Sequence, residues 1–107
     1  MSYKLFLDDL RYPVDNSPEW RIARNYHDAK WMVEAYGMPQ FISFDHDLGH
    51  GGFDGYDFAK WFVAWVIAND ASVDNFTFDV HSMNPIGAAN ISYYMRNFVD
   101  ARVKGVI

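Results

Sequence analysis

The sequence predicts an α/β fold: an open, mostly parallel sheet of four or five strands with helices on both faces. Short apolar segments alternate with longer amphipathic ones along the 107 residues, which is the pattern of strands joined by helical crossovers. Half of the residues are hydrophobic and 19% are aromatic, so the chain can build one core and one domain over residues 1–107.

The first part of the chain is expected to carry two strands and a helix. Lys4–Leu7 is a short apolar run of strand character. Two prolines and several turn-forming residues make residues 10–19 a loop rather than a helix. Residues 20–26 follow as a short strand. Asn25 then has the character of a helix N-cap, with Asp28 three positions later as its partner in a capping box.

The middle of the chain is expected to hold the central strand and an unusually apolar helix. Phe41–Phe44 is a continuous run, broken only by a serine, as in a parallel strand covered on both faces. Asp54 is a candidate N-cap for the helix that follows. Residues 56–68 are apolar nearly all round the helix, which indicates either deep burial or contact with a second copy in a homodimer.

The last part of the chain is expected to form an edge strand and a final helix. Residues 76–81 alternate between apolar and polar side chains, as in a strand with one wetter face. Asn84 is a candidate N-cap and is followed by proline at the first helical position. The tail, residues 102–107, is compatible either with fraying or with a further short edge strand.

Composition excludes several classes of protein. The formal net charge of −5 at pH 7 argues against non-specific binding of DNA or RNA, which takes a basic surface. Cysteine is absent, which excludes disulfides, thiolate metal sites and a cysteine nucleophile. The amino terminus has no signal-peptide or anchor pattern, and the longest apolar run is too short to cross a bilayer. We therefore expect no membrane partner and a cytoplasmic location, the host cytoplasm if a phage encodes the chain.

Polar side chains gather directly after three of the predicted strands. They are Asp8, Asp9 and Arg11 after the first strand, Asp45, His46, Asp47 and His50 after the central one, and His81, Ser82 and Asn84 after the last. Parallel strands bring their carboxyl ends to one edge, which is where open α/β sheets bind ligands. Each of these residues alone is ordinary in a turn or a cap, but three polar strand ends together indicate a site.

The carboxylates of this edge favour a divalent cation. Several acidic residues crowded together repel one another, and a bound cation or a raised pKa must relieve the repulsion. Oxygen ligands suit Mg²⁺ or Mn²⁺, whereas a closed zinc site takes histidines and thiolates. A cation would also let a phosphate-bearing ligand approach an acidic protein. The candidate ligands are Asp8, Asp9, Asp45 and Asp47.

Several segments resemble the receiver domains of response regulators. LDD at 7–9 resembles the acidic pair that ends a receiver's first strand. Residues 47–55 resemble, at the same spacing, the receiver segment from the phosphoacceptor aspartate to its Asp-Gly helix start. Ser82 lies where receivers carry the switch serine or threonine. The resemblance covers most of the chain in order and implies a compact receiver-like (flavodoxin-like) fold, truncated relative to a full receiver.

Departures from the receiver pattern indicate a narrower group. Residues 10–19 are a proline-broken loop where receivers have a helix, and the chain stops before their fifth strand and fifth helix. LDDLRYP at 7–13, SFDHDLG at 43–49 and HSMNPIG at 81–87 are similar to the cyclic-phosphate processing receiver-like domains, the cREC group. That resemblance implies action on cyclic phosphates, in RNA repair or in nucleotide-signalling conflict between bacteria and phages.

The implied activity is that of a phosphoesterase that opens a cyclic nucleotide or a 2′,3′-cyclic phosphate end with the help of a divalent metal. The chemistry needs a polarised phosphoryl oxygen, an activated nucleophile and a proton donor for the leaving alkoxide. His46 and His81 are the expected base and acid, in either order, and Asp47 is the third catalytic candidate. The substrate-binding candidates are Arg11, Ser82, Asn84 and His50.

Two other functions are compatible with the same residues. In a phosphoacceptor receiver, a signalling module, Asp47 would be phosphorylated while Asp8 and Asp9 hold Mg²⁺. The missing lysine position and the additional histidines stand against that reading. A non-catalytic binder that sequesters a cyclic nucleotide needs the same phosphate contacts as a hydrolase, so the sequence does not separate these two.

Overall fold

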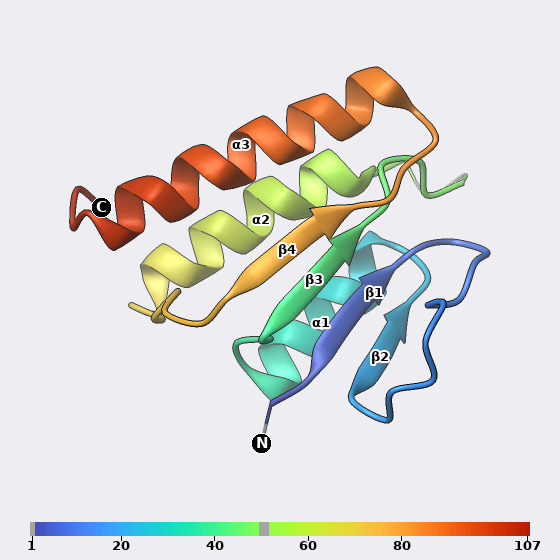
Figure 1. Cartoon of the computed structure of the whole chain (residues 1–107), viewed down its shortest axis with the longest axis horizontal. Coiled ribbons are helices and arrows are strands. Elements are labelled where there is room, and N and C mark those ends of the chain that lie inside the picture. The colour runs from blue at the N-terminus through green and yellow to red at the C-terminus, as the bar shows by residue number, and fades with distance from the viewer. Residues whose placement is uncertain (1, 50–51) are drawn as a thin grey trace.

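The computed structural model describes residues 2–49 and 52–107, which form strands and helices in the predicted order. The strands are β1 (Lys4–Leu7), β2 (Trp20–Ala23), β3 (Phe41–Phe44) and β4 (Thr77–Val80); the helices are α1 (Tyr26–Tyr36), α2 (Gly55–Ala68) and α3 (Pro85–Val103). All strand pairs are parallel and the sheet order is β2-β1-β3-β4 (Figure 1). The predicted open parallel α/β fold is therefore confirmed.

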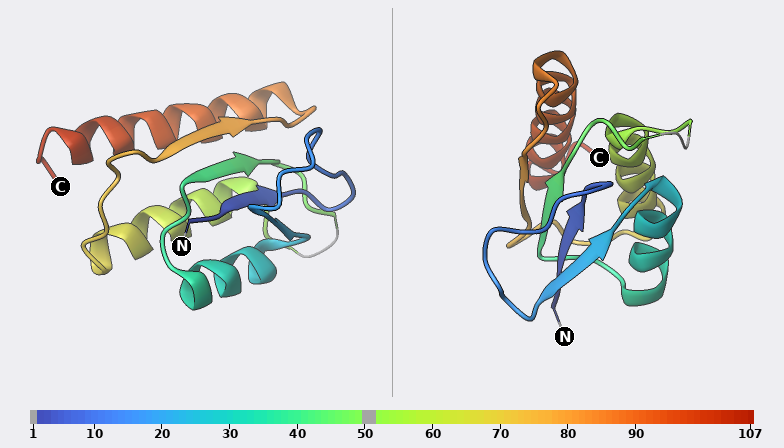
Figure 2. Two further views of the ribbon diagram at one scale, coloured as in Figure 1. Left: turned by 60° about the horizontal axis from the view of Figure 1, so that its bottom comes forward. Right: turned by 90° about the vertical axis from the view of Figure 1, so that its right-hand side faces the viewer.

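Strand residues alternate between the two faces of the sheet, and one face carries the core. The core residues of the central strands are fully buried and pack with apolar residues from all three helices; they are Leu5, Leu7, Ile42 and Phe44. Phe6 and Ser43 point to the other face, on the side where the loop of residues 8–19 runs (Figure 2). The helices thus cover one face and not the expected two, because this proline-broken loop stands in place of a helix.

The apolar surface of α2 is explained by its position between α1 and α3 (Figure 2). Phe58 and Phe62 are fully buried in the core. On one flank Tyr56 contacts Tyr94 of α3 edge-to-face at 5.5 Å, and on the other Lys30 of α1 lies over the Trp61 ring at 5.9 Å. Contacts within the chain therefore account for much of the apolar pattern that suggested a homodimer. None of the described helices is long and apolar enough to cross a membrane.

Side-chain caps start each helix where the sequence predicts them. The Asn25 side chain accepts a hydrogen bond from the backbone N–H three residues later, at 2.8 Å. Asp54 and Asp57 form a reciprocal capping box at the start of α2, with both bonds at 2.9 Å. Asn84 caps α3 through the N–H of Gly87 at 2.9 Å. The last two caps fix the backbone beside the carboxyl edge of the sheet.

The carboxyl-terminal tail closes α3 and adds no strand. The helix continues to Val103, further than the start of the tail expected at residue 102. Gly105 then adopts φ of +77°, a left-handed conformation that favours glycine, and the Val106 N–H donates to the Ala101 carbonyl at 2.9 Å. This turn uses the residues that a fifth strand would need, so the described sheet has four strands.

Candidate functional site

The three polar strand ends meet because the parallel hydrogen-bond ladder continues one residue past each strand. The N–H of Asp8 donates to the Ala23 carbonyl at 3.1 Å, that of Asp45 to Leu7 at 3.0 Å, and that of His81 to Phe44 at 2.9 Å. Asp8, Asp45 and His81 therefore stand side by side at the carboxyl edge. Each presents one ligand-type atom, and the three atoms lie within 4.8 Å of one another.

Asp8 is a fully buried carboxylate whose oxygens are both engaged by protein donors. Its Oδ1 accepts from the backbone N–H groups of Leu10 and Arg11, at 2.8 and 2.7 Å. Its Oδ2 contacts Arg11 Nε and His81 Nε2, each at 2.9 Å. Burial alone would raise the Asp8 pKa, but these four contacts outweigh it and hold the pKa below its usual range.

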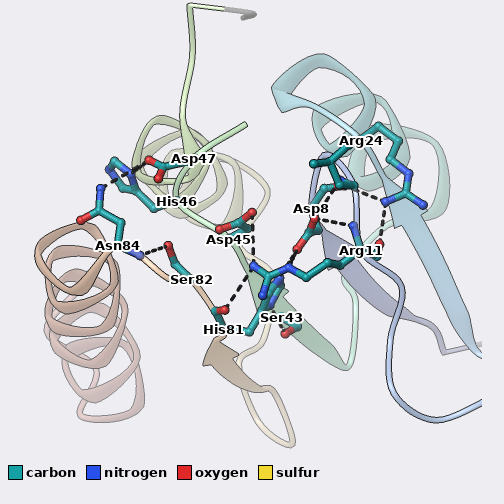
Figure 3. A network of polar contacts seen from close by, with 11 residues as sticks. Asp8, Arg11, Arg24, Ser43, Asp45, His46, Asp47, His81, Ser82 and Asn84 are labelled. Atoms are coloured by element: carbon teal, nitrogen blue, oxygen red, sulfur yellow. Dashed lines mark hydrogen bonds and ion pairs between the residues drawn. The ribbon is translucent and has the colours of Figure 1, made fainter. Parts of the chain in front are cut away.

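Arg11 links the two buried carboxylates and is itself held by a second arginine (Figure 3). Its guanidinium pairs closely with Asp8 and reaches Asp45 only at 3.8 Å, through Nη2. Arg24 Nη1 donates to the backbone carbonyls of Asp8 and Arg11, at 3.0 and 2.6 Å. The loop that follows β1 is thus fixed at both its side chains and its backbone.

Asp45 is the less well compensated of the two buried carboxylates. Burial and the neighbouring Asp8 charge raise its pKa, and His81, Ser82 and Arg11 offset this only in part. Among the described residues, the closest cationic nitrogen to its carboxylate is Arg11 Nη2 at 3.8 Å. This side chain therefore carries negative charge at the edge of the sheet that the described residues do not fully neutralise.

The His81 ring is fixed by contacts to one of its faces and to both of its nitrogens. Its ring stacks on Phe6 with the centroids 4.6 Å apart, and its two nitrogens contact Asp8 Oδ2 and Ser43 Oγ, the latter at 2.7 Å. The Ser43 hydroxyl also contacts Asp79. Because an ionised carboxylate can only accept hydrogen bonds, His81 Nε2 is a donor to Asp8, alongside Arg11 Nε.

His46 orients Asp47 on the other side of the site (Figure 3). His46 Nδ1 contacts Asp47 Oδ1 at 2.8 Å, and its Nε2 lies 3.3 Å from Asp54 Oδ2. Asn84 Nδ2 donates to the same Asp47 oxygen at 3.4 Å. These bonds, first that of His46 and then that of Asn84, lower the Asp47 pKa. The Asp47 side chain is nevertheless 69% exposed, so it is a fixed carboxylate that a ligand can reach.

Gly87 makes room for the His46 ring. A Cβ at this position would lie 2.3 Å from His46 Cγ, which no packed structure tolerates without a shift. Because Gly87 also donates its N–H to Asn84, the first turn of α3 both caps itself and supports the histidine.

Gly87→Ala is expected to destabilise the protein by about 1–3 kcal/mol through overpacking against His46, although glycine-to-alanine changes in helices usually stabilise. Urea unfolding measures the change. Asn90→Ala, at an exposed position of the same helix, is the control and should stabilise slightly. Removing the ring with His46→Ala should cancel the cost of Gly87→Ala. A gain in stability from Gly87→Ala alone would contradict the packing seen here.

A shallow pocket of about 320 Å³ opens between these groups. It is lined by Asp8, Asp9, Leu10, Arg11, Asp45, Asp47 and Met83. The four acidic candidates and Arg11 are thus brought to one place, while His46, His81, Ser82 and Asn84 support them from beside the pocket. His50 lies outside the described residues. A larger hollow of about 640 Å³ between β4 and α3 lies away from this cluster of acids and histidines.

The donor set of the pocket fits a hard divalent cation in part. Asp8 has no free oxygen, because four protein donors already use it. Asp9 and Asp45 line the pocket with carboxylate oxygens, and within residues 2–49 and 52–107 no cationic nitrogen lies closer to Asp45 than Arg11 Nη2 at 3.8 Å. Mg²⁺ commonly binds proteins through one or two carboxylates and completes its shell with water and phosphate oxygens. Asp9 and Asp45 are therefore the residues that suit such an ion.

One known protein family accounts for most of the chain. A family model described as the cyclic-phosphate processing receiver domain matches residues 3–97. The chain belongs to this family. The resemblance expected from its three motifs is confirmed, and with it the receiver-like fold. No curated protein and no solved structure matches the chain.

The roles of three residues of this cyclic-phosphate processing receiver domain at the site are not predictable from the sequence. Arg24 donates through its guanidinium to a loop more than ten residues earlier in the chain. Ser43 is a serine in an apolar strand, and its partners are Asp79 on β4 and His81 just after it. Gly87 matters because of what packs against it. The serine within the apolar run was the one visible signal of a polar contact beneath the site.

Proposed function

We propose that this receiver domain hydrolyses a cyclic phosphodiester and releases a phosphomonoester. The observation that carries the proposal is that the Asp47 side chain is both held in place and exposed. Its Oδ1 is fixed by His46 at 2.8 Å, while the side chain lines the pocket and is largely exposed. A carboxylate that is oriented by the protein and open to a ligand suits a general base acting on water.

The reaction needs one proton acceptor and an open exit for the leaving group. Water attacks phosphorus, Asp47 takes the proton of that water, and the bond from phosphorus to one ring oxygen breaks. The released alkoxide takes a proton from solvent, to which the shallow pocket is open, and Asp47 returns its own proton to solvent. The cyclic phosphodiester thereby becomes a phosphomonoester and a free hydroxyl.

The remaining charged residues hold the reacting groups in place. Arg11 lines the pocket and its side chain is 46% exposed, so its guanidinium is suited to contact phosphate oxygens. Both ring nitrogens of His46 and of His81 already have partners. We therefore assign them to positioning, His46 for Asp47 and His81 for the pair of Asp8 and Arg11, in place of the acid and base roles expected from the sequence.

A divalent cation, Mg²⁺ or Mn²⁺, is part of the proposal. Asp9 and Asp45 would hold it, because both carboxylates line the pocket and Asp45 is only weakly paired with Arg11, at 3.8 Å. When bound, such an ion polarises a phosphoryl oxygen and reduces the repulsion between an anionic substrate and the carboxylates.

Turnover is therefore expected to depend on a divalent cation. The test screens nucleoside 2′,3′-cyclic phosphates, 3′,5′-cyclic nucleotides and cyclic dinucleotides, with Mg²⁺, Mn²⁺ and EDTA arms and chromatography of the products. We expect a phosphomonoester in the metal arms and about a hundredfold slower reaction in EDTA. Activity that survives full chelation would remove the cation from the scheme. Tight binding with unchanged ligand would identify a non-catalytic binder and overturn the proposal.

A phosphoacceptor receiver is the second candidate, and the exposure of Asp47 favours it. The residue lies at the position that resembles the phosphoacceptor, and a small phosphodonor could reach it. Incubation with acetyl phosphate followed by intact mass measurement separates the two functions. A stable aspartyl-phosphate adduct without turnover of cyclic phosphates would favour signalling.

A further inference from the structure

We propose that Leu10 and Met83 form an apolar clamp for the base of a nucleotide. The proposal rests on the proposed function, since it concerns the same pocket, and it narrows the substrate class. Among cyclic phosphodiesters, the ligand is a nucleoside cyclic phosphate. A cyclic phosphate without a base is expected to bind poorly.

Leu10 and Met83 are two large apolar side chains exposed at the mouth of a charged pocket. Leu10 is 78% and Met83 84% exposed, and both line the pocket. The other lining residues are four aspartates and Arg11. An exposed apolar side chain alone is normal on a protein surface, but two beside one charged pocket suit a ligand with an ionic end and an apolar end.

Both side chains are presented by a fixed backbone. The backbone N–H groups of Leu10 and Arg11 donate to the buried Asp8 carboxylate, at 2.8 and 2.7 Å. Met83 lies between Ser82 and Asn84. The Asn84 N–H donates to the Ser82 hydroxyl at 3.1 Å, and the Asn84 side chain caps α3. Little conformational entropy remains to be lost by these backbone segments when a ligand binds.

The strand order places the two residues on opposite sides of the central carboxylates. Leu10 follows β1 and Met83 follows β4, and these strands flank β3, which carries Asp45 and Asp47 at its end. A phosphate beside Arg11 and the β3 carboxylates would therefore leave the rest of the ligand between Leu10 and Met83. A flat base suits a pocket lined by two such side chains because it offers two apolar faces, and a methionine sulfur contacts aromatic rings favourably.

Binding of three ligands tests the clamp by isothermal titration calorimetry: adenosine 2′,3′-cyclic phosphate, uridine 2′,3′-cyclic phosphate and glycerol 1,2-cyclic phosphate. We expect both nucleotides to bind at least about tenfold more tightly than the glycerol compound. Leu10→Ser and Met83→Ser should each weaken nucleotide binding about tenfold and leave glycerol cyclic phosphate within about twofold. Purine and pyrimidine should respond alike, because apolar contacts are non-directional.

Matched controls are Val14→Ser in the same loop as Leu10 and Ile86→Ser shortly after Met83. Both residues are highly exposed, at 104% and 76%, and neither lines the pocket. These variants should bind all three ligands as the unmodified protein does. The clamp is overturned if no nucleotide binds, if the base adds no affinity, or if the controls weaken binding as much as the clamp variants. Binding that shows the expected pattern without turnover supports the clamp and refutes the hydrolase. Turnover with no preference for a base supports the hydrolase and refutes the clamp.

Discussion

Asp47→Asn is expected to reduce turnover of a cyclic phosphate by about 10²–10⁴-fold, the usual contribution of a general base. Asparagine has the same shape and can still accept from His46, but its amide does not take a proton from water. Because the Asp47 side chain is 69% exposed, the folded state should be almost unaffected. Initial rates and thermal unfolding of the two proteins, measured together, check both parts of the prediction.

Asp74→Asn is the matched control for this experiment. Asp74 is also an exposed aspartate, but it precedes β4 and so lies at the amino end of the parallel sheet, opposite the pocket. This variant should retain the rate of the unmodified protein. If Asp47→Asn stays within about threefold of that rate, Asp47 is not the proton acceptor.

Asp8→Asn is expected to destabilise the protein by about 3–5 kcal/mol, while Asp45→Asn leaves stability unchanged or raises it by about 1 kcal/mol. The two residues occupy equivalent places after adjacent strands, but their surroundings differ. Asp8 accepts from four donors that include Arg11 and His81, and an asparagine amide would leave some of these unpaired. Asp45 carries a buried charge that its neighbours do not fully compensate, and its raised pKa reflects this.

Urea unfolding at neutral pH in EDTA measures both changes without a contribution from bound metal. Asp100→Asn is the control, since Asp100 pairs with Lys104 at 3.0 Å where both side chains are 66% exposed. Removing such an exposed pair should change stability by about 0.5 kcal/mol or less. Equal decreases in the free energy of unfolding for Asp8→Asn and Asp45→Asn would show that the difference in their surroundings does not affect stability.

The succession of strands and helices along the chain could be predicted from local patterns, and the meeting of the polar strand ends followed from it. Apolar runs such as Phe41–Phe44 mark the strands, and Asn25, Asp54 and Asn84 mark the helix starts with side chains that bond their own backbone. Parallel pairing then brings the strand ends together without further information.

What each polar side chain contacts at the edge could not be predicted, because the partners are distant in sequence. The four acidic residues suggested a cation bound by all of them, yet Asp8 is already satisfied by Arg11, His81 and two backbone N–H groups. His81 is engaged by Ser43, which is 38 residues earlier in the chain. The two prolines of residues 10–19 did predict a loop in place of a helix, but the expectation of helices on both faces of the sheet did not take this loop into account.

The central claim is that this pocket opens a cyclic phosphodiester with Asp47 as base. Phosphorus NMR of nucleoside 2′,3′-cyclic phosphates in ¹⁸O-enriched water, with Mg²⁺ and either the unmodified protein or Asp47→Asn, tests it most directly. We predict that the cyclic signal is replaced by a phosphomonoester signal with the isotope shift of an incorporated ¹⁸O, and that Asp47→Asn leaves the cyclic signal in place on the same timescale. A cyclic signal that persists with the unmodified protein, or that disappears equally fast with Asp47→Asn, would contradict the account.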